Sequence, residues 1–381
     1  PIPPNNWEAI WSRDTNSAWW WNKERQQFYM HSFDYSMPTL NLNNRATQNA
    51  ILDVAKYWFS LGVDGFRLDA ATHYAPDPQL RNNPIDENGE QIHIYDYNTV
   101  GGYKFLNRLK ALCDTYPGSK KLLAEYHYTK DPHGIRRGKH VAKFCTCDAF
   151  FTNALNNGLT DIAERISEDL AIYPYGEKLN WALSNHDMER AATRIFGRNY
   201  TPEKLIMLTS LLLTLPGSIC IYQGEELGLP NPKSFKKCKN PKRDPLNIWT
   251  NFNSPWDASR AGFAMSSKRS DPSRKMALRP DKEQYALAVE NQAAKGSVLS
   301  ETKRLITERK NGIFDQYGDV KFLPISPENK DKVIAYVRTV KDSDEKMLCL
   351  YNFSDEDCTI IYECAQIELK ATSYKHIRLD L

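Results

Sequence analysis

The sequence predicts an α/β fold, in which parallel strands alternate with helices as in a βα barrel, followed by a smaller antiparallel β module. Three observations predict it. Strand-length apolar runs follow helical patterns several times before residue 223, three of these runs end in a carboxylate, and after Gly312 short β segments separated by charged turns replace the helices. A chain of 381 residues is also longer than one core usually fills, so a large domain and a smaller one are expected.

The elements before residue 223 are expected to alternate in type. The first 44 residues are rich in Pro, Asn and aromatic residues and lack a sustained period, so they are predicted to be irregular, with short strands at most. Apolar residues at helical spacing and strand-length apolar runs give the remaining elements. Helices are predicted at 44–61, 101–115, 157–170 and 202–214, and strands at 65–68, 121–125, 149–151, 179–184 and 218–222.

After residue 229 the sequence pattern changes, first to a loop-like composition and a charged helix, and then to short β segments. Residues 230–273 are dominated by Lys, Asn, Pro and Ser and are predicted to form a long loop bordering a cleft. A charged helix is predicted at about 283–310. The antiparallel β module is then predicted to contain strands at 333–339, 347–353, 359–362 and 374–379.

The composition narrows the class of protein. Hydrophobic residues make up 41% of the chain and charged residues 25%, as in an ordinary globular protein, so disorder is not expected. The net charge is +3, and the basic residues are interleaved with acidic ones, which argues against a nucleic-acid or membrane surface. The eight cysteines show neither the density of a disulfide scaffold nor paired C-x-x-C spacing, and no run of about 18 apolar residues predicts a membrane span. From this thiol usage we expect a cytoplasmic location.

Three apolar, strand-like runs each deliver one carboxylate at their end. A carboxylate in such a run is costly to desolvate unless it emerges into a polar site, and in a parallel βα barrel the carboxyl ends of all strands open onto one face. We therefore expect these groups to converge at one cleft. The runs are GVDGFRLDA (62–70), LLAEYHY (122–128) and LSNHD (183–187), and their carboxylates are Asp69, Glu125 and Asp187.

Such a cluster is what cleavage of a glycosidic bond requires. Hydrolysis with retention uses one ionised carboxylate as nucleophile and one protonated carboxyl as acid, roughly 5 Å apart, around a transition state with oxocarbenium character. A third acidic group can bind sugar hydroxyls and stabilise positive charge. Repulsion among the carboxylates and partial burial would raise the pKa of one of them and so set the role of the acid.

Each of these residues also has a plainer interpretation. An Asp after an apolar strand commonly caps the next helix, which is an alternative role for Asp69. Glu125 can be a buried acid paired with an arginine of a neighbouring strand, and Asp187 beside His186 can be half of a metal site, although no second cluster has ligand spacing. The aromatic run at 19–21 can be a sugar platform or core packing.

Four blocks resemble the signature blocks of the α-amylase superfamily, glycoside hydrolase family 13. The closest similarity is to its α-glucosidase and oligo-1,6-glucosidase branch. PPNNW and the aromatic stretch that ends in MPTLN are similar to the loop domain that this branch inserts after its third barrel strand. The four blocks are GFRLDA (65–70), LLAEYHY (122–128), SNHD followed by MER (184–190) and YQGEELGL (222–229).

The resemblance implies a partial TIM (β/α)8 barrel and a domain order. The family's first three strands and its first block are absent, so the chain resembles a fragment that begins inside the loop domain. The implied domains are a remnant of the loop domain at 1–44, a barrel domain with strands 4 to 8 at 45–311, and a C-terminal β-sandwich at 312–381.

The resemblance also assigns roles to the acidic residues. Asp69 would be the nucleophile, Glu125 the general acid/base and Asp187 the stabiliser of the transition state. Arg67 lies two positions before Asp69, on the same face of the strand, and would keep that carboxylate ionised through a charge-assisted hydrogen bond. Glu225, in the block after the last strand, is expected to shape its loop rather than react.

Four further residues would form the sugar site. His186 would bind the sugar of the innermost subsite, Phe33 would pack on that sugar's apolar face, and Arg190 would line the cleft. At position 70 the α-1,4-acting members of this branch carry a small residue and the α-1,6-acting members tend to carry Val, so Ala70 resembles the α-1,4-acting ones.

Three positions depart from the family's pattern. Thr39 stands where the family usually has Asp, and Met37 where many α-glucosidases have Gln. Asn247 and a longer loop replace an expected arginine. These changes bear on sugar contacts and leave the three carboxylates in place.

The sequence therefore predicts a retaining α-glucosidase that cleaves short, α-linked oligosaccharides, most simply α-1,4-linked ones. Two alternatives stay open. One is a non-catalytic, amylase-like ectodomain such as those of amino-acid transporter heavy chains, and the other is a sucrose- or trehalose-directed hydrolase or isomerase of the same family. No cofactor and no partner other than a small oligosaccharide is expected, and a calcium site would be expected only in the part of the barrel that precedes Pro1.

Overall fold

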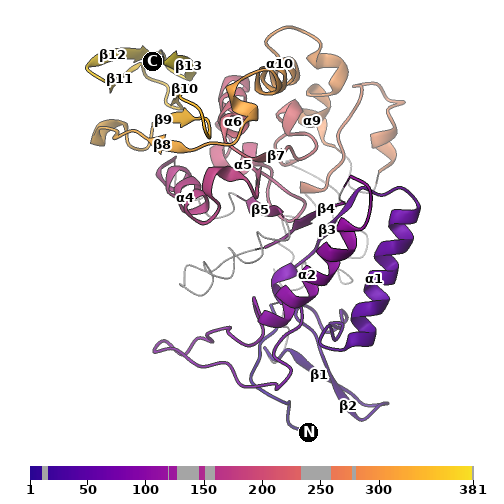
Figure 1. Ribbon diagram of the computed structural model, residues 1–381. Helices are drawn as coiled ribbons and strands as arrows, with labels where there is room; N and C mark the ends of the chain where they lie inside the picture. Colours follow the sequence, from indigo (N-terminus) through magenta and orange to yellow (C-terminus); the bar gives the residue numbers. More distant parts are fainter. Residues whose placement is uncertain are drawn as a thin grey trace. The chain divides into compact units, whose positions relative to one another are not determined.

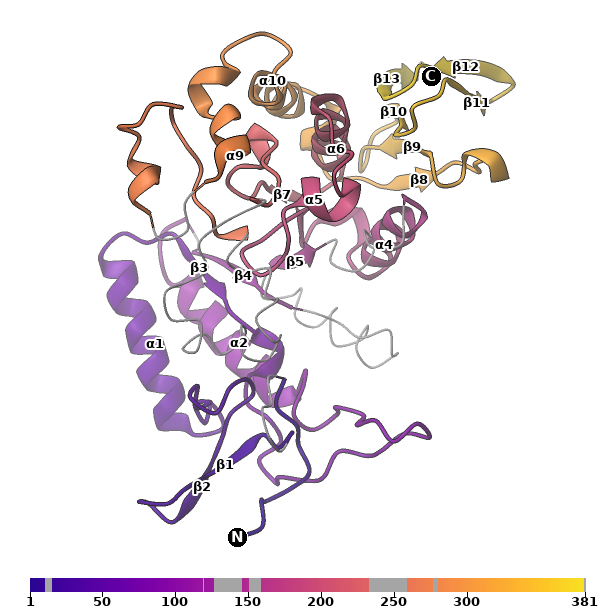
Figure 2. The ribbon, with the colours of Figure 1, turned by 180° about the vertical axis from the view of Figure 1, so that it is seen from behind.

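The computed structural model describes residues 1–10, 16–118, 120–126, 146–150, 159–232, 259–276 and 280–379, and for 146–150 and 159–161 it describes the backbone. The chain divides into two compact units. The first holds residues 1–148 and 240–254, and the second holds residues 149–239 and 255–381. Figures 1 and 2 show the elements of both units from two sides.

The first unit contains a hairpin and two helix-and-strand pairs. The hairpin is antiparallel, with Trp19 opposite Met30. β3 pairs in parallel with β4, and β4 with β5 at Thr146–Phe150. Gly65 is required at the β3–β4 pairing, because a Cβ there would collide with the backbone of Lys121. The other elements are β1 (Trp19–Asn22), β2 (Gln27–Met30), α1 (Arg45–Ser60), β3 (Gly65–Leu68), α2 (Val100–Asp114) and β4 (Lys121–Ala124).

The helix α1 shows why this order arises from the sequence. Asn44 caps its N-terminus, since the side-chain oxygen accepts hydrogen bonds from the N–H groups of Ala46 and Thr47. Phe59 is buried, and Gly62, at φ 93°, lets the chain leave the helix and enter β3 three residues later. The ends of α1 and β3 agree with the prediction to within one residue.

The second unit begins with helices and a pair of parallel strands. β6 pairs with β7, with Asn180 opposite Ser218. α6 is almost wholly buried and lies beside α10 in both ribbon views (Figures 1 and 2). The elements are α4 (Leu159–Ile172), β6 (Leu179–Ala182), α5 (Ala191–Phe196), α6 (Pro202–Thr214), β7 (Ser218–Cys220), α9 (Lys282–Ala286) and α10 (Val298–Lys310).

The C-terminal part of this unit is an antiparallel β-sandwich, as predicted. A sheet in the order β13-β10-β9-β8 faces the hairpin β11–β12, and the buried core includes Leu348 and Leu350 of the sheet and Ile360 and Leu369 of the hairpin. The strands are β8 (Val320–Phe322), β9 (Val333–Thr339), β10 (Lys346–Asn352), β11 (Cys358–Tyr362), β12 (Ala365–Leu369) and β13 (Ser373–Leu379).

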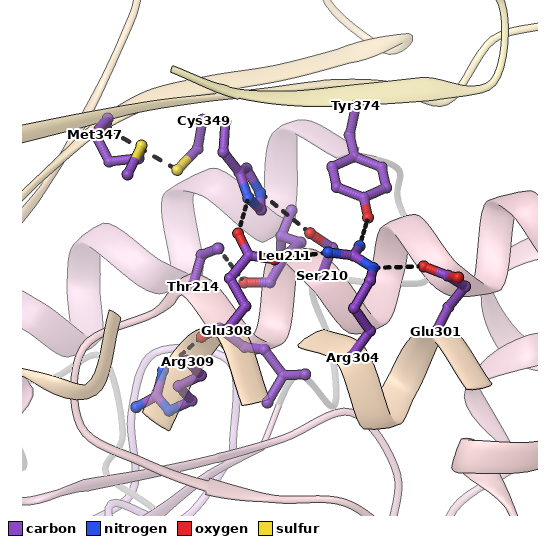
Figure 3. Close-up of polar contacts among 12 residues, drawn as sticks. Ser210, Leu211, Thr214, Glu301, Arg304, Glu308, Arg309, Met347, Cys349 and Tyr374 are labelled. Atoms are coloured by element: carbon purple, nitrogen blue, oxygen red, sulfur yellow. Dashed lines mark hydrogen bonds and ion pairs between the residues drawn. The ribbon is translucent and has the colours of Figure 1, made fainter. Parts of the chain in front are cut away.

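A polar network joins this β module to α6 and α10 (Figure 3). Arg304 of α10 donates to the hydroxyl of Tyr374 at 2.7 Å and pairs with Glu308 at 2.9 Å. The ring of His376, on β13, reaches Glu308 through one nitrogen and Ser210 of α6 through the other, each at 3.2 Å. These contacts, together with apolar packing, fix the module on the helices.

One predicted helix was wrong, and three short elements were not predicted. The predicted single helix at about 283–310 is broken into α9, a 3-10 turn at Val289–Gln292 and α10, because Gly296 has a positive φ and Ser297 caps a new helix. The short elements α5, β8 and β12 were missed. Residues 233–258 of the predicted loop at 230–273 lie outside the described part of the chain, and Asn247 is among them.

The predicted domain boundaries stay predictions. α1 begins at Arg45 and α10 ends at Lys310, next to the boundaries expected at residues 44 and 311, whereas the two compact units divide the chain elsewhere. In the described ranges no helix is long and apolar enough to cross a bilayer.

Candidate active site

The first unit brings two of the predicted carboxylates together where β3 and β4 end. The guanidinium of Arg67 contacts both of them, Asp69 Oδ1 through Nη1 and Glu125 Oε2 through Nη2, the latter at 3.1 Å. Arg67 and Asp69 share a face of the strand because they are two residues apart. One guanidinium therefore contacts both carboxylates, and Asp69 and Glu125 lie on either side of it.

The backbone around this pair is also held by Glu125. Its Oε2 accepts a hydrogen bond of 2.8 Å from the N–H of Ala70, its own N–H donates to Leu68 O at 2.9 Å, and its carbonyl accepts from Ala71 at 3.1 Å. Ala70 adopts φ 44° and ψ 42°, a left-handed conformation that is unfavourable for a residue other than glycine. The turn after β3 is thus tied to β4, and it directs Asp69 outward.

The two carboxylates differ in their surroundings. The side chain of Asp69 is 79% exposed, and that of Glu125 is 17% exposed. Asp69 is therefore the more accessible of the two carboxylates, whereas Glu125 is more shielded and is held by Arg67 and by the N–H of Ala70.

A cavity of about 260 Å³ in the first unit has Ala70, the residue after Asp69, in its lining. Phe33 and Ala70 both line it, as does His73, whose ring centroid is 5.2 Å from that of Phe33. Thr39 also lines it, and its hydroxyl accepts a hydrogen bond of 2.9 Å from the N–H of Ser32. Phe33 and Ala70, predicted to contact the sugar, thus share one largely apolar hollow.

Asp187 lies in the second unit, in the loop after β6. Its Oδ1 pairs with Arg260 at 3.0 Å and its Oδ2 lies 3.3 Å from Nε2 of His186. Its N–H donates to Oδ1 of Asn185 at 2.9 Å. The side chain is 36% exposed, so it can still accept further hydrogen bonds. Its convergence with Asp69 and Glu125 stays a prediction.

Arg260 is a residue that the sequence analysis missed. Besides pairing with Asp187, it donates through Nε to the carbonyl of His186 at 2.9 Å, and Ser259 donates to the same carbonyl at 3.1 Å. Arg260 lies within the predicted loop at 230–273, and it carries no pattern that marks it. The neighbouring block SNHD gives no sequence signal for a partner more than 70 residues away.

Arg190, which is expected to line the cleft, is a buried residue of the second unit. It is 1% exposed, and its guanidinium donates to the carbonyls of Gln223 at 2.9 Å and Ala261 at 3.0 Å. Burial lowers the pKa of Arg190. The side chain thus connects the segments around Gln223 and Ala261 through their carbonyls. That Arg190 contributes to sugar binding stays a prediction.

The metal interpretation of His186 and Asp187 gains no support. In the part of the chain that the structure describes, no group of three or more His, Cys, Asp or Glu side chains could hold an ion. The two residues instead contact each other, and Asp187 contacts Arg260.

Comparison with known proteins relates this geometry to a family. The chain is 31% identical over 388 residues to a "Probable alpha-glucosidase" of Rhizobium meliloti (strain 1021), covering 94% of this chain and 66% of that protein. It is 28% identical over 284 residues to the "Amino acid transporter heavy chain SLC3A1" of Homo sapiens, covering 70% and 40%. The chain thus spans no more than about two thirds of the length of these curated relatives.

A solved structure agrees with these relatives. The α-glucosyl transfer enzyme XgtA is 26% identical and superposes with a TM-score of 0.82 over 98% of this chain and 74% of that one. The fold is accordingly that of α-amylase-family TIM-barrel enzymes with a C-terminal β domain. The family of α-amylase catalytic domains matches residues 1–317, and this chain belongs to that family.

Proposed function

We propose that the protein is a retaining α-glucosidase, which releases glucose from short α-linked oligosaccharides through a covalent glycosyl-enzyme. The observation that carries the proposal is the guanidinium of Arg67 between Asp69 and Glu125 at the ends of two adjacent parallel strands. The similarity to a probable α-glucosidase and to an α-glucosyl transfer enzyme supports the same class of chemistry. In this proposal β3 to β7 correspond to strands 4 to 8 of an eight-stranded barrel.

The proposed mechanism begins with attack by Asp69. Its ionised carboxylate, held by Arg67, would attack the anomeric carbon, while Glu125 donates its proton to the leaving oxygen. Water deprotonated by Glu125 would then release the sugar with its original α configuration. Asp187, supported by Arg260, would stabilise positive charge as it develops on the sugar ring.

The sugar would be oriented by apolar and polar contacts. Phe33, beside Ala70 in the cavity of the first unit, offers an aromatic face to the apolar side of a pyranose ring. His186 would hydrogen-bond a ring hydroxyl. The small side chain of Ala70 supports the α-1,4 linkage.

The first experiment measures hydrolysis of p-nitrophenyl α-glucoside by the wild-type protein and by Asp69→Asn. The amide cannot act as a nucleophile, so kcat/KM should fall by about 1,000-fold or more. Asp64→Asn is the matched control, because Asp64 lies at the start of the same segment with a fully exposed side chain, and it should keep wild-type turnover.

Two outcomes would contradict this assignment. Equal turnover in wild type and Asp69→Asn would exclude Asp69 as nucleophile. Release of β-glucose as the first product, observed by proton NMR of the anomeric signal, would show inversion rather than retention.

A second candidate is a non-catalytic interaction subunit, favoured by the similarity to the transporter heavy chain. The presence of Asp69, Glu125 and Asp187 together with the bridging arginine supports the enzyme instead. A wild-type protein that folds cooperatively but cleaves no α-glucoside, maltose, sucrose or trehalose would support the second candidate.

A further inference from the structure

The three consecutive tryptophans of β1 do not share one face of the hairpin β1–β2, which Figure 1 labels. Successive side chains of a strand point to opposite faces, so Trp19 and Trp21 share one face and Trp20 lies on the other. Trp19 packs on the buried cluster around Trp7, with ring centroids 6.1 Å apart. Trp21 meets the edge of Phe28 at 4.9 Å. Packing within the first unit thus accounts for Trp19 and Trp21 and leaves Trp20 unexplained.

Trp20 forms a stacked pair with a tyrosine from outside the hairpin. It is the most exposed large apolar side chain of β1 and β2, at 36%. Its indole stacks on the ring of Tyr35, with centroids 4.6 Å apart and planes inclined by 24°. Tyr29 lies directly opposite Trp20 in the hairpin, and its hydroxyl donates to the carbonyl of Tyr35 at 2.6 Å. The pair is therefore anchored to β2, while part of the indole stays open to solvent.

The turn that carries Tyr35 is fixed by a buried side chain. Asp34 is 1% exposed, and its Oδ1 accepts hydrogen bonds from the N–H of Ser36 at 2.9 Å and from the hydroxyl of Ser36 at 2.6 Å. The carbonyl of Asp34 accepts from the N–H of Met37 at 2.8 Å. Because this turn is already ordered, a ligand that stacks on the pair pays little to immobilise it.

The same segment borders the cavity of the first unit. Phe33, two residues before Tyr35, lines that cavity together with Ala70. Two residues of chain span at most about 7 Å, so the backbone of Tyr35 lies within that distance of the backbone of Phe33. The stacked pair is thus continuous in sequence with the candidate sugar site.

The chemistry around Trp20 fits a sugar better than a protein partner. A pyranose ring presents an apolar C–H face and hydroxyls at its edge, so it needs one aromatic face with polar groups nearby. The exposed turn at 23–26, which begins three residues after Trp20, supplies Lys, Glu, Arg and Gln side chains. A stable protein interface buries about 800 Å² on each partner, and one open indole next to a charged turn offers far less apolar surface.

We propose that Trp20 and Tyr35 form a sugar-binding platform, on which a glucosyl unit of a longer oligosaccharide stacks outside the catalytic pair of Asp69 and Glu125. The platform raises the affinity for oligosaccharides long enough to reach both it and the cavity, and it leaves the affinity for a single glucoside unchanged. That the ligand is an α-linked glucan rests on the proposed function, whereas the sugar-binding surface itself does not.

Nuclear magnetic resonance of the indole groups tests the platform without relying on activity. The probe is maltohexaose, and the measurement uses the full chain with Asp69→Asn, so that the sugar stays intact. With nitrogen-15 tryptophan, the Nε1–H signal of Trp20, assigned from its absence in Trp20→Tyr, should shift as maltohexaose is added. Trp58 is the internal control. It is 45% exposed on α1 and contacts the ring of Tyr57 at 5.6 Å, and its signal should not shift.

Substitutions measure how much the platform contributes. In the Asp69→Asn protein, Trp20→Ala should weaken maltohexaose binding, measured by isothermal titration calorimetry, by about fivefold, because one sugar ring loses its aromatic partner. Trp20→Tyr keeps an aromatic face and should bind within about twofold of its parent. Trp58→Ala removes a similarly exposed indole and should not change the affinity. With Asp69 restored, Trp20→Ala should hydrolyse p-nitrophenyl α-glucoside like wild type.

Three results would overturn the platform. They are a Trp20 signal that maltohexaose does not move, equal affinities of Trp20→Ala and its parent, and a Trp20 signal that moves with protein concentration instead of sugar. The last result would identify a contact between two copies of the chain. A wild-type protein without glucosidase activity would refute the proposed function, and a Trp20 signal that still shifts with maltohexaose would support the platform on its own.

Discussion

Arg67 is the residue on which the geometry of the candidate site depends most. Its guanidinium presents two nitrogen donors to two different carboxylates, and Glu125 in turn accepts the N–H of Ala70. A planar guanidinium can make these two contacts at once in a fixed orientation. Arg67 therefore links the two carboxylates and places a positive charge beside each of them.

Arg67→Lys tests this role while keeping the positive charge. A single ammonium cannot span both carboxylates in the same geometry, so kcat/KM for p-nitrophenyl α-glucoside should fall by about 100-fold. Arg45→Lys, at the exposed start of α1, is the matched control and should keep wild-type activity. Activity of Arg67→Lys within twofold of wild type, with unchanged thermal stability, would show that the bridge has no catalytic importance.

The sequence was sufficient to predict that Asp69 and Glu125 lie at the ends of two strands, because each ends a strand-length apolar run. It was not sufficient to predict the ion pair of Arg260 with Asp187, because Arg260 lies in a segment without periodicity. Arg190 illustrates a different limit. Its place in a family block suggested a sugar contact, but the block does not say whether the side chain is exposed, and the structure buries it.

At the scale of elements, the buried arginines of the second unit join helices to strands. Arg338 of β9 is 0% exposed and donates to the carbonyl of Thr214, at the end of α6, at 3.2 Å. It also donates to the carbonyls of Gln316 and Thr339. Burial lowers the pKa of Arg338 to about 10, which leaves it charged at neutral pH.

Arg338→Met should lower the free energy of unfolding by about 2 to 4 kcal/mol, because the buried carbonyl of Thr214 loses its contact with the guanidinium and the carbonyls of Gln316 and Thr339 lose a donor. Urea denaturation followed by circular dichroism measures this change. Arg378→Met is the control in the same β module. Arg378 is 67% exposed and pairs with Glu345 at the surface, so its loss should cost less than about 1 kcal/mol. Equal losses in the two variants would mean that the Arg338 contacts do not hold the module on α6.

The long periodic elements were predictable from the sequence, and the short or interrupted ones were not. α6 and β9 have the predicted ends because continuous apolar patterns with clear boundaries define them. The prediction of one helix at 283–310 was wrong because charged residues recur at helical spacing on both sides of Gly296 and of the cap at Ser297. β12 was not predicted because its five residues alternate without a strongly apolar side.

At the scale of the whole molecule, the account depends on carboxylates from distant parts of the sequence acting on one sugar. Asp69 and Glu125 belong to the first unit and Asp187 to the second. The order of the family blocks predicts that they act together, but each unit's own contacts can be derived only from its own residues. A chemical measurement on the intact protein tests the combined site.

The most direct measurement is trapping of the covalent intermediate with a 5-fluoro-α-glucosyl fluoride, followed by intact-mass and peptide analysis. The fluorine at carbon 5 slows both steps by destabilising the oxocarbenium-like transition state, while the good leaving group lets the first step proceed. The account predicts a mass increase of one fluoroglucosyl group on the peptide that contains Asp69, and none in Asp69→Asn. Turnover of the reagent with no adduct, or an adduct on a different carboxylate, would contradict the assignment of Asp69 as the nucleophile.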